Sequence, residues 1–356
     1  MAFRIAAMVS AACLAGGGAA PAVAGAVPAV SCSPAFEPAT ITVMYQPSGA
    51  SSYFYANAAK VWEKFGLKLN AIKVEAGQSE LAALSAGSVD FAFLGGPPTI
   101  TAIGRKLPVK VVFSTNDVSH GEGLVVLPSS GIKSLADLPG KTVASPKGSS
   151  AWVGMHLTLA QAGIPIDKVH VLDLSPNAIQ ASFSNGTVQA AWIWDTWGER
   201  LKTLGAKVIA VEHDHGVSEP NTWVVNEQFL KAHPDIVARF VAALNVGADG
   251  ANRDPAVAAP EFSMLTGVTK EQALHIMANE PTFTIDTGLG NDSPLSFVNT
   301  QAGIANTLAR SGAVLQKYGI LPDAPNRDQI AQALDVTSLR QAKDLLAKRC
   351  NYAPAH

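Results

Sequence analysis

The sequence has little excess charge of either sign and almost no cysteine. Its 26 Lys and Arg residues nearly balance 28 Asp and Glu residues, which leaves a net charge of -2 on 356 residues. Proteins that grip nucleic acid carry a basic excess, so this balance argues against a nucleic-acid partner and favours a small molecule. The three cysteines form no cluster. After the N-terminus no apolar run is long enough to cross a membrane, so we expect a soluble mature protein.

Several motifs of nucleotide binding and catalysis are also missing. No P-loop of the form GxxxxGK[ST] occurs, so a nucleotide phosphate is a poor candidate ligand. There is no GxSxG elbow, HExxH helix or Cys-His nucleophile pair, and nothing argues for an enzyme. His213 and His215 flank Asp214, but two histidines at this spacing without a third clear ligand are more typical of a loop. We expect no metal and no cofactor.

The first 24 residues have the features of a cleaved signal peptide. Arg4 supplies an early positive charge, an apolar stretch runs from Ile5 to about Ala20, and Ala22-Val23-Ala24 forms a small-x-small cleavage site. The apolar stretch is too short and too rich in glycine for a good membrane span. The sequence therefore predicts export of the mature protein.

Two cysteines remain once the leader is removed. Cys13 lies within the leader, and Cys32 and Cys350 lie near the two ends of the mature chain. In an oxidising compartment such a pair favours one disulfide, with two unpaired thiols as the alternative. Neither Cys13 nor Cys32 follows a convincing lipobox, because Ser10 and Ala29 occupy the position of a large aliphatic residue. A lipid anchor is therefore disfavoured.

One pattern occurs twice along the chain. Residues Gly77 to Gly96 and Pro176 to Asp195 align on Gly87 and Gly186, and each copy predicts a short amphipathic helix, a left-handed cap and a buried strand. We infer two similar α/β halves. Where such halves face each other, the loops after their strands converge on one crevice, the usual ligand position in open α/β sheets.

Strand and helix signals alternate over the first part of the chain, which predicts largely parallel sheets. A helix is expected from Ser52 to Phe65, and helices alone from Glu227 to Lys348. The expected strands are Ile41 to Gln46, Leu69 to Glu75, Val89 to Gly95, Val109 to Thr115, Leu124 to Leu127, Thr142 to Ser145, Lys168 to Leu174, Val188 to Trp194, Lys207 to Glu212 and Thr222 to Val225.

The helical C-terminal part is too long to cover the second half alone, so we expect it to return to the first half. The chain then crosses twice between lobes, near Gly123 to Val126 and near Trp223 to Val225. Lobe 1 comprises residues 39–123 and 224–356, and lobe 2 comprises residues 124–223. Two crossings form a hinge that can close on a ligand. The expected hinge residues are Glu122, Gly123 and Trp223.

Three loops after predicted strands carry small hydrogen-bonding residues ahead of a helix: Gln46 to Ser52, Gly95 to Thr99 and Pro146 to Ala151. Backbone N–H groups and hydroxyls at a helix N-terminus bind anions, and glycine lets the backbone approach closely. Serine and glycine also cap helices and form turns without binding anything. Three loops on one edge favour an anion site. The candidate ligand residues are Gln46, Ser48, Gly95, Gly96, Pro97, Ser149 and Ser150.

The run WIWDTW, residues 192–197, ends another predicted strand. We assign Trp192 to the core. Trp194 and Asp195 are assigned to the crevice, where an indole wall and a carboxylate can meet a ligand. The alternative is that both Trp side chains pack in the core and Asp195 caps the next helix. Polar residues beside the crossings contact the ligand or pin the open and closed states; they are Asn116, Asp117, His120, Glu122, Glu219 and Asn221.

Four blocks of sequence resemble the solute-binding proteins of taurine and aliphatic-sulfonate ABC importers. They are FLGGPPTITAIGRKLPVKVV, EGLVVLPSSGIKSLADLPGKTVASPKGSSAW, SPNAIQASFSNGTVQAAWIWDTW and NTWVVNEQFLKAHPDIVARF. The likeness covers about Ile41 to Phe240, and nitrate-binding and thiamine-precursor-binding proteins are wider relatives. The resemblance implies a two-lobed periplasmic-binding-protein fold of type II. It also implies a periplasmic location and delivery of the ligand to a membrane permease driven by an ATPase.

The resemblance further implies that a sulfonate is held by the loop after Gly95-Gly96 and by the helix that begins at Ser149-Ser150. In taurine binders an Asp two residues before the Trp of the WVV block can receive the ammonium group. Asn221 occupies that position here. Trp194-Asp195 is similar to the Trp-Asp pair of the alkanesulfonate binders. The implied ligand is a small sulfonate, either taurine or an alkanesulfonate.

Other functions are kept as alternatives at this stage. A periplasmic receptor of this kind could bind another small anion or a thiamine-precursor-like molecule, or could report its ligand to a membrane sensor. A pyrimidine synthase of the same superfamily depends on a Cys-rich motif and works in the cytosol. The missing Cys cluster and the export signal disfavour that enzyme. We expect a monomer whose protein partner is the permease.

Overall fold

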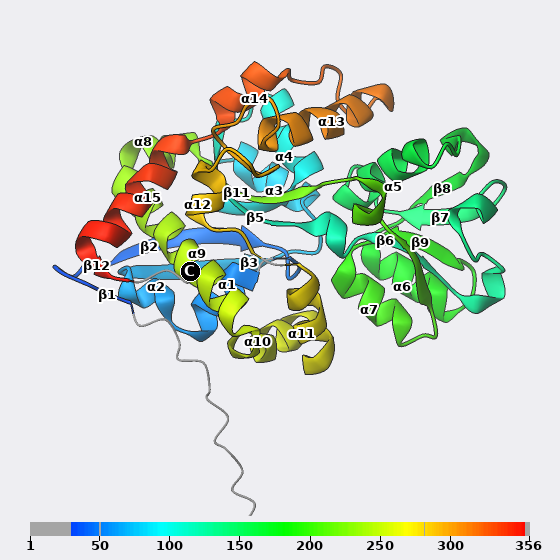
Figure 1. Cartoon of the computed structure of the whole chain (residues 1–356), viewed down its shortest axis with the longest axis horizontal. Coiled ribbons are helices and arrows are strands. Elements are labelled where there is room, and N and C mark those ends of the chain that lie inside the picture. Colours follow the sequence, from blue (N-terminus) through cyan, green and yellow to red (C-terminus); the bar gives the residue numbers. More distant parts are fainter. Residues whose placement is uncertain (1–29, 50, 281, 353–356) are drawn as a thin grey trace, which may run out of the picture.

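The computed structural model describes residues 30–49, 51–280 and 282–352; the predicted signal peptide and Cys13 lie outside them. Within this part of the chain the strands form two five-stranded sheets and one short two-stranded sheet. Helices pack against both larger sheets, and Figure 1 shows the result as two lobes side by side. The predicted two-lobed α/β fold is confirmed.

The first sheet has the strand order β3-β2-β4-β11-β5. Its strands are β2 (Ala39–Tyr45), β3 (Leu67–Lys73), β4 (Phe91–Gly95), β5 (Val109–Asp117) and β11 (Pro220–Asn226). β2 is parallel to β3 and β4, whereas β11 is antiparallel to both of its neighbours, β4 and β5. The reversed strand is the one that arrives from the other lobe.

The second sheet has the order β10-β6-β9-β7-β8. Its strands are β6 (Gly123–Val126), β7 (Thr142–Ser145), β8 (His170–Asp173), β9 (Ala190–Ile193) and β10 (Lys207–Val211). β7 is parallel to β8 and β9, and β6 is antiparallel to β9 and β10. Here too the reversed strand follows a crossing. The strands of both sheets overlap the predicted ones, in the predicted order.

Residues 118–122 and 212–219 carry the chain between the sheets. Each segment includes one turn of 3₁₀ helix, η1 (Val118–His120) and η5 (His213–His215). The second crossing was predicted near Trp223 to Val225, and that position is wrong. β11 begins at Pro220 and pairs along its length with β5, so the crossing ends earlier. Trp223 is fully buried in the first lobe and is no hinge residue.

Helices fill the connections and the C-terminal part of the chain. Before β11 they are α1 (Ser51–Ala58), α2 (Val61–Lys64), α3 (Gln78–Ser85), α4 (Gly96–Gly104), α5 (Ser150–Gln161), α6 (Pro176–Ser184) and α7 (Asp195–Lys202). After it they are α8 (Glu227–Ala232), α9 (Pro234–Arg253), α10 (Ala259–Thr266), α11 (Lys270–Asn279), α12 (Ile285–Leu289), α13 (Ile304–Lys317), α14 (Arg327–Ala333) and α15 (Val336–Arg349). Single turns lie at Pro128–Ser130, Leu135–Asp137, Ile166–Lys168 and Pro255–Val257.

Left-handed residues set several helix ends. Gly87 and Gly186, with φ of 64° and 74°, follow α3 and α6 and lead into β4 and β9, so the repeated unit has the predicted form. The single helix predicted from Ser52 to Phe65 is instead two helices. Lys60 adopts φ 53° between them, and a left-handed residue cannot continue a right-handed helix.

An aromatic cluster forms the core of the first lobe. Trp223 lies at its centre, with ring centroids 5.2 to 5.7 Å from those of Tyr53, Phe93 and Phe240. Helix α9 packs on this cluster and close to α1. A Cβ atom at Gly247 would lie 2.1 Å from the backbone oxygen of Ser52, so only glycine allows this approach.

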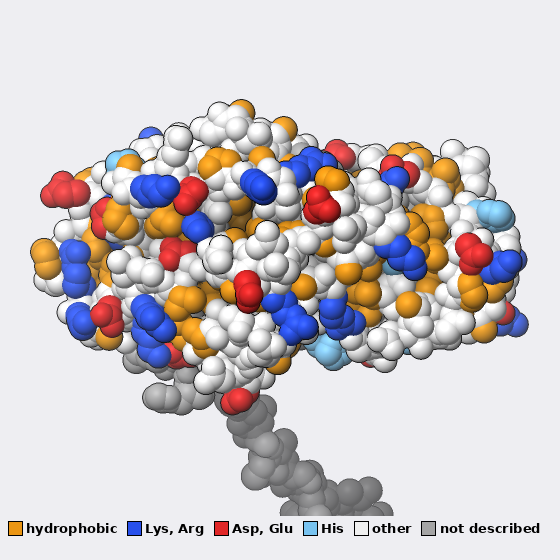
Figure 2. Space-filling model, turned by 90° about the horizontal axis from the view of Figure 1, so that it is seen from above, with side chains coloured by type: hydrophobic (Ala, Val, Ile, Leu, Met, Phe, Trp, Pro, Cys, Tyr) orange, Lys and Arg blue, Asp and Glu red, His pale blue; other side chains and the backbone are white. Residues whose placement is uncertain are grey.

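The surface agrees with the balanced composition. On the face displayed in Figure 2, Lys and Arg side chains are interspersed with Asp and Glu rather than gathered into one patch. No helix in the described part of the chain combines the length and the apolar character needed to cross a membrane.

The two ends of the described chain are tied together in the first lobe. Strand β1 (Ser31–Cys32) pairs with β12 (Cys350–Asn351), and Cys32 and Cys350 form a disulfide across 318 positions of sequence. The predicted disulfide is confirmed.

We predict that replacing both cysteines, Cys32→Ser with Cys350→Ser, lowers the free energy of unfolding by about 4 to 5 kcal/mol. The bridge closes a very long loop, and its removal restores conformational freedom to the unfolded chain. Urea denaturation followed by tryptophan fluorescence measures the difference against the oxidised wild type. An unchanged denaturation midpoint would show that the bridge contributes nothing.

Candidate functional site

A small cavity lies where the strand ends of the two sheets meet. It measures about 50 Å³, and its lining comes from the ends of β2, β3, β4, β7 and β9 and the segments that follow them, from the first crossing, and from the start of the antiparallel β11. We call it the central cavity. The predicted ligand residues that line it are Gln46, Ser48, Gly95, Ser149, Ser150, Trp194 and Asn221. Both lobes contribute, so a ligand held here contacts both.

Ser149 and Ser150 place the start of α5 at the central cavity. The Ser149 Oγ accepts a hydrogen bond from the backbone N–H of Trp152 at 3.1 Å and so caps the helix. The Ser150 hydroxyl donates to the Oε1 of Glu122 at 2.5 Å. Ser150 therefore connects α5 to the first crossing. The positive end of the α5 dipole also faces this region, which favours an anion.

Of the three predicted ligand residues in the Gly95 loop, Gly95 lines the central cavity, and Gly96 and Pro97 do not. Gly95 lines the central cavity, and a Cβ atom there would lie 3.6 Å from the Ser150 Oγ. At Gly96 a Cβ atom would instead lie 2.7 Å from Oε2 of Glu219 on the second crossing. Pro97 sits in the first turn of α4, and Pro98 supplies the lining. Gly96 and Pro97 are thus packing positions.

The two amide side chains of the central cavity are already hydrogen-bonded to polar neighbours. Gln46 donates to Oε2 of Glu80 at 2.9 Å. Asn221 donates to the Oδ1 of Asn116 at 3.1 Å, and Asn116 in turn donates to the Oε2 of Glu280 at 2.7 Å. This chain links the central cavity to a second cavity beside it.

Trp192 and Trp194, the first two of the three tryptophans in the WIWDTW run, have different surroundings. Trp192 is fully buried and donates its indole N–H to the Oε1 of Glu212 at 2.7 Å. Trp194 precedes α7 and lines the central cavity. Asp195 does not line it. This carboxylate faces the second cavity, of about 200 Å³, which also contains Glu280 and shares Glu122 with the first. We call this space the acidic cavity.

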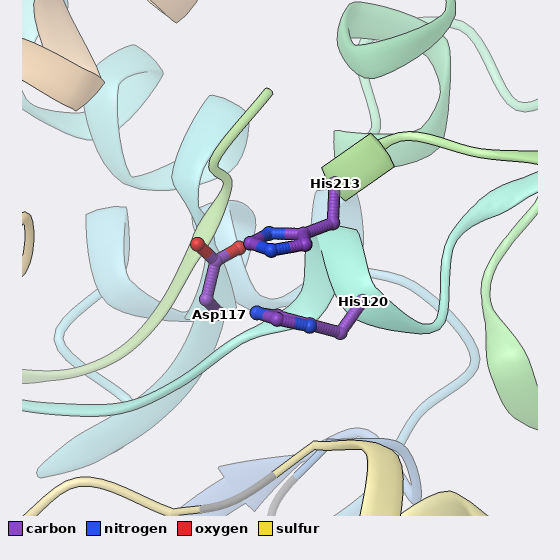
Figure 3. Close-up of side chains that lie close together, drawn as sticks. All are labelled: Asp117, His120 and His213. Atoms are coloured by element: carbon purple, nitrogen blue, oxygen red, sulfur yellow. The ribbon is translucent and has the colours of Figure 1, made fainter. Parts of the chain in front are cut away.

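The first crossing enters its sheet through a glycine. A Cβ atom at Gly123 would lie 2.0 Å from the backbone oxygen of Ala210 in β10, so glycine is required there. Beside this point, Asp117, His120 and His213 lie close enough to hold a metal ion between the crossings (Figure 3).

Five carboxyl groups are buried around the crossings: Glu122, Asp195, Glu212, Glu219 and Glu280. Each has one oxygen with a polar partner and one oxygen without any. None of them belongs to an ion pair within the described residues. Burial without a countercharge favours the neutral acid form.

Burial raises the pKa of all five groups, to about 6 for Asp195 and to about 8 for Glu219. Repulsion from neighbouring carboxylates raises the pKa of Glu122 and Glu280 further. The two neighbouring acids Asp195 and Glu280 also affect each other: Glu280 lowers the pKa of Asp195, and Asp195 raises that of Glu280.

Comparison with known proteins identifies the family. Residues 50–258, more than half of the chain, match the family described as NMT1/THI5 like. The chain belongs to this family. The taurine-binding periplasmic protein of Escherichia coli is 29% identical over 56% of this chain and 62% of its own length. A putative binding protein of Brucella abortus is 28% identical over 58% of this chain and 65% of its own length, so the match leaves a third of that relative uncovered.

Solved structures support the fold of this family member. The alkanesulfonate-binding protein of Xanthomonas axonopodis pv. citri bound to MOPS has a TM-score of 0.69 at 23% identity, covering 85% of this chain and 99% of that one. The aliphatic sulphonate-binding protein of Escherichia coli also scores 0.69, at 21% identity, over 82% and 92% of the two chains. A desulfurization enzyme shares the fold with a TM-score of 0.62 at 15% identity, over 86% and 99%.

Sequence reasoning missed Glu280 and Glu212 as members of the site. Glu280 follows α11 and reaches Asp195 from the other lobe, and Glu212 directly precedes η5. Neither belongs to a strand-end loop with small residues, which was the signal used. An isolated Glu at the end of a helix or strand usually faces solvent, so no local pattern distinguishes these two buried residues from surface glutamates.

We predict that the ligand-free protein loses stability as the pH rises from 4 to 8. An acid whose folded-state pKa is raised holds its proton more tightly in the folded than in the unfolded protein, so its contribution to stability is complete below the unfolded pKa near 4. That contribution falls as the pH rises from about 4, and the loss is complete above about pH 6 for Asp195 and above about pH 8 for Glu219. The part due to Asp195 is on the order of 3 kcal/mol. Thermal unfolding across this pH range measures the effect.

The variant Asp195→Asn should flatten the profile between about pH 4 and 6 and keep the fall between about pH 6 and 8. The exposed Asp323 serves as the control, and Asp323→Asn should retain the wild-type profile. A wild-type thermal midpoint that rises over this range would contradict the assigned direction.

Proposed function

We propose that this protein is the extracytoplasmic solute-binding component of an ABC importer for small sulfonates. The proposal includes a periplasmic location, a non-enzymatic role and delivery of the ligand to a membrane permease. The observation that carries it is the central cavity, whose lining comes from strand ends of both sheets and includes the start of α5. A ligand there contacts both lobes, and such contacts are what drive closure of a hinge.

The donors at the central cavity suit an oxyanion. The Ser150 hydroxyl and the first turn of α5 lie on one side, and the end of β4 at Gly95 lies on the other. Glu122 lines the same cavity, and its raised pKa favours the neutral acid, which does not repel an anion. A neutral Glu122 can donate to the Ser150 Oγ, so that the single Ser150 proton, which the ligand-free structure directs to Glu122, becomes free for the anion. The sulfonate-binding relatives and structures named above support the choice of ligand class.

We predict that Ser150→Ala weakens the binding of ethanesulfonate roughly tenfold to a hundredfold. The variant loses one hydrogen bond to a charged group, worth about 1.5 to 3 kcal/mol. Isothermal titration calorimetry measures the change. Ser175→Ala is the matched control, because Ser175 caps α6 in the same lobe but does not line the central cavity.

The control should bind ethanesulfonate like the wild type. If Ser150→Ala changes the affinity less than twofold, the anion is held elsewhere. If the wild type binds no sulfonate at all, the proposed ligand class is wrong.

We also predict that the wild type binds ethanesulfonate at least as well as taurine. Asn221 offers an amide oxygen to the taurine ammonium but no charge, and a desolvated cation without a countercharge is costly. A competition experiment compares the two ligands. Asn221→Asp should shift the preference towards taurine roughly tenfold. Asp195→Asn should weaken taurine binding, because this carboxylate lies next to the central cavity.

The expected changes are opposite in sign, so the two variants control for each other. A wild type with a strong preference for taurine that neither substitution alters would place the cation site at other residues.

A further inference from the structure

Three potential metal ligands converge where the two crossings lie side by side. Asp117 ends β5, His120 ends η1 on the first crossing, and His213 begins η5 on the second. One donor atom from each residue lies within 4.8 Å of the other two. Figure 3 shows the two imidazole rings facing each other with the Asp117 carboxylate beside them. The ring centroids are 3.6 Å apart, and the ring planes are inclined by 22°.

The donor set identifies the class of ion. Two imidazole nitrogens and one carboxylate oxygen suit Zn²⁺ and the neighbouring transition metals, whereas Ca²⁺ and Mg²⁺ require mainly oxygen ligands. His213 is exposed and His120 is partly exposed, so water can complete the coordination. Rotation about the side-chain bonds of the exposed His213 is enough to turn its nitrogen towards a shared ion.

The Asp117 carboxylate is held in place by both crossings. Its Oδ1 accepts hydrogen bonds from the backbone N–H and the hydroxyl of Ser119, at 3.1 and 2.6 Å, and from the backbone N–H of Glu219 at 2.9 Å. Its Oδ2 accepts one from the hydroxyl of Ser218 at 2.5 Å. Ligating carboxylates are typically oriented by outer hydrogen bonds of this kind.

No cationic side chain is paired with the acids on the crossings. Glu122, Glu212 and Glu219 lie on the two crossings, and each is at least nine-tenths buried with one carboxyl oxygen that has no partner. In the described part of the chain no Lys or Arg forms an ion pair with them. A divalent cation at the crossings would therefore have no cationic side chain as a competitor.

We propose that Asp117, His120 and His213 form a Zn²⁺ site that joins the two crossings. The ion ties β5 and η1 to η5 and adds to the hydrogen bonds that already join the two crossings. The sequence offered no third ligand near His213 and His215. The tertiary structure brings Asp117 at the end of β5 and His120 on the first crossing to His213.

The test uses the full mature protein without a histidine tag, stripped with a chelator. Titration with Zn²⁺ by calorimetry should show one ion per chain and an increase in the thermal midpoint. Co²⁺ should give visible ligand-field absorption that Zn²⁺ abolishes, and Mg²⁺ should not compete. A wild type that binds no Zn²⁺ at micromolar concentrations would overturn the proposal.

Two ligand variants and one control locate the ion. His213→Ala and His120→Ala should each lower the affinity for Zn²⁺ at least about tenfold, the effect that even an outer-shell partner has. His215→Ala is the control, because His215 lies on the same turn and is not part of the cluster. Its affinity should equal that of the wild type. Wild-type affinity in His213→Ala, or an equal loss in His215→Ala, would refute the site.

Discussion

The two segments that cross between the lobes are hydrogen-bonded to each other, and the rest of the site depends on this contact. The backbone oxygen of Glu219 accepts a hydrogen bond from the N–H of Val118, and its N–H donates to the Asp117 carboxylate. The backbone N–H of Glu212 donates to the backbone oxygen of Glu122. After each crossing the chain adds one strand to the sheet it enters, β6 to the second sheet and β11 to the first. Each of these strands runs antiparallel to both of its neighbours. Both crossings therefore run through one narrow region, and the strand ends of both sheets meet around it.

This arrangement buries five carboxyl groups that form no ion pair in the described part of the chain. Glu122 is the residue that connects the separate parts, since it accepts from Ser150, lines both cavities and belongs to the first crossing. Burying such groups costs stability unless they keep their protons. Natural proteins accept such local costs mainly where a site is needed. The acidic cavity at the crossings has this character, since five buried acids with raised pKa values gather beside it.

The fold does not by itself distinguish a receptor from an enzyme, because binding proteins and a desulfurization enzyme share it. The distinction comes from the side chains that reach the cavity. Around the central cavity the polar side chains are hydroxyl and amide groups, the indole of Trp194, the ammonium of Lys147 and the carboxyl group of Glu122, whose raised pKa favours the neutral form. Both cysteines of the described chain are bound in a disulfide far from the cavity, in the β1-β12 sheet.

The sequence by itself predicted where the strands lie along the chain, the glycine caps at Gly87 and Gly186, and a disulfide as the favoured state of its two mature cysteines. These follow from periodicity within a few residues and from the small number of cysteines. Only the tertiary structure decided that Gly96 faces the second crossing, that Asp195 meets Glu280, and that His120 meets His213. The physical reason is the separation along the sequence over which each feature is decided. Hydrophobic period and backbone conformation are set by neighbouring residues, whereas the partner of a polar side chain depends on how elements far apart in sequence pack.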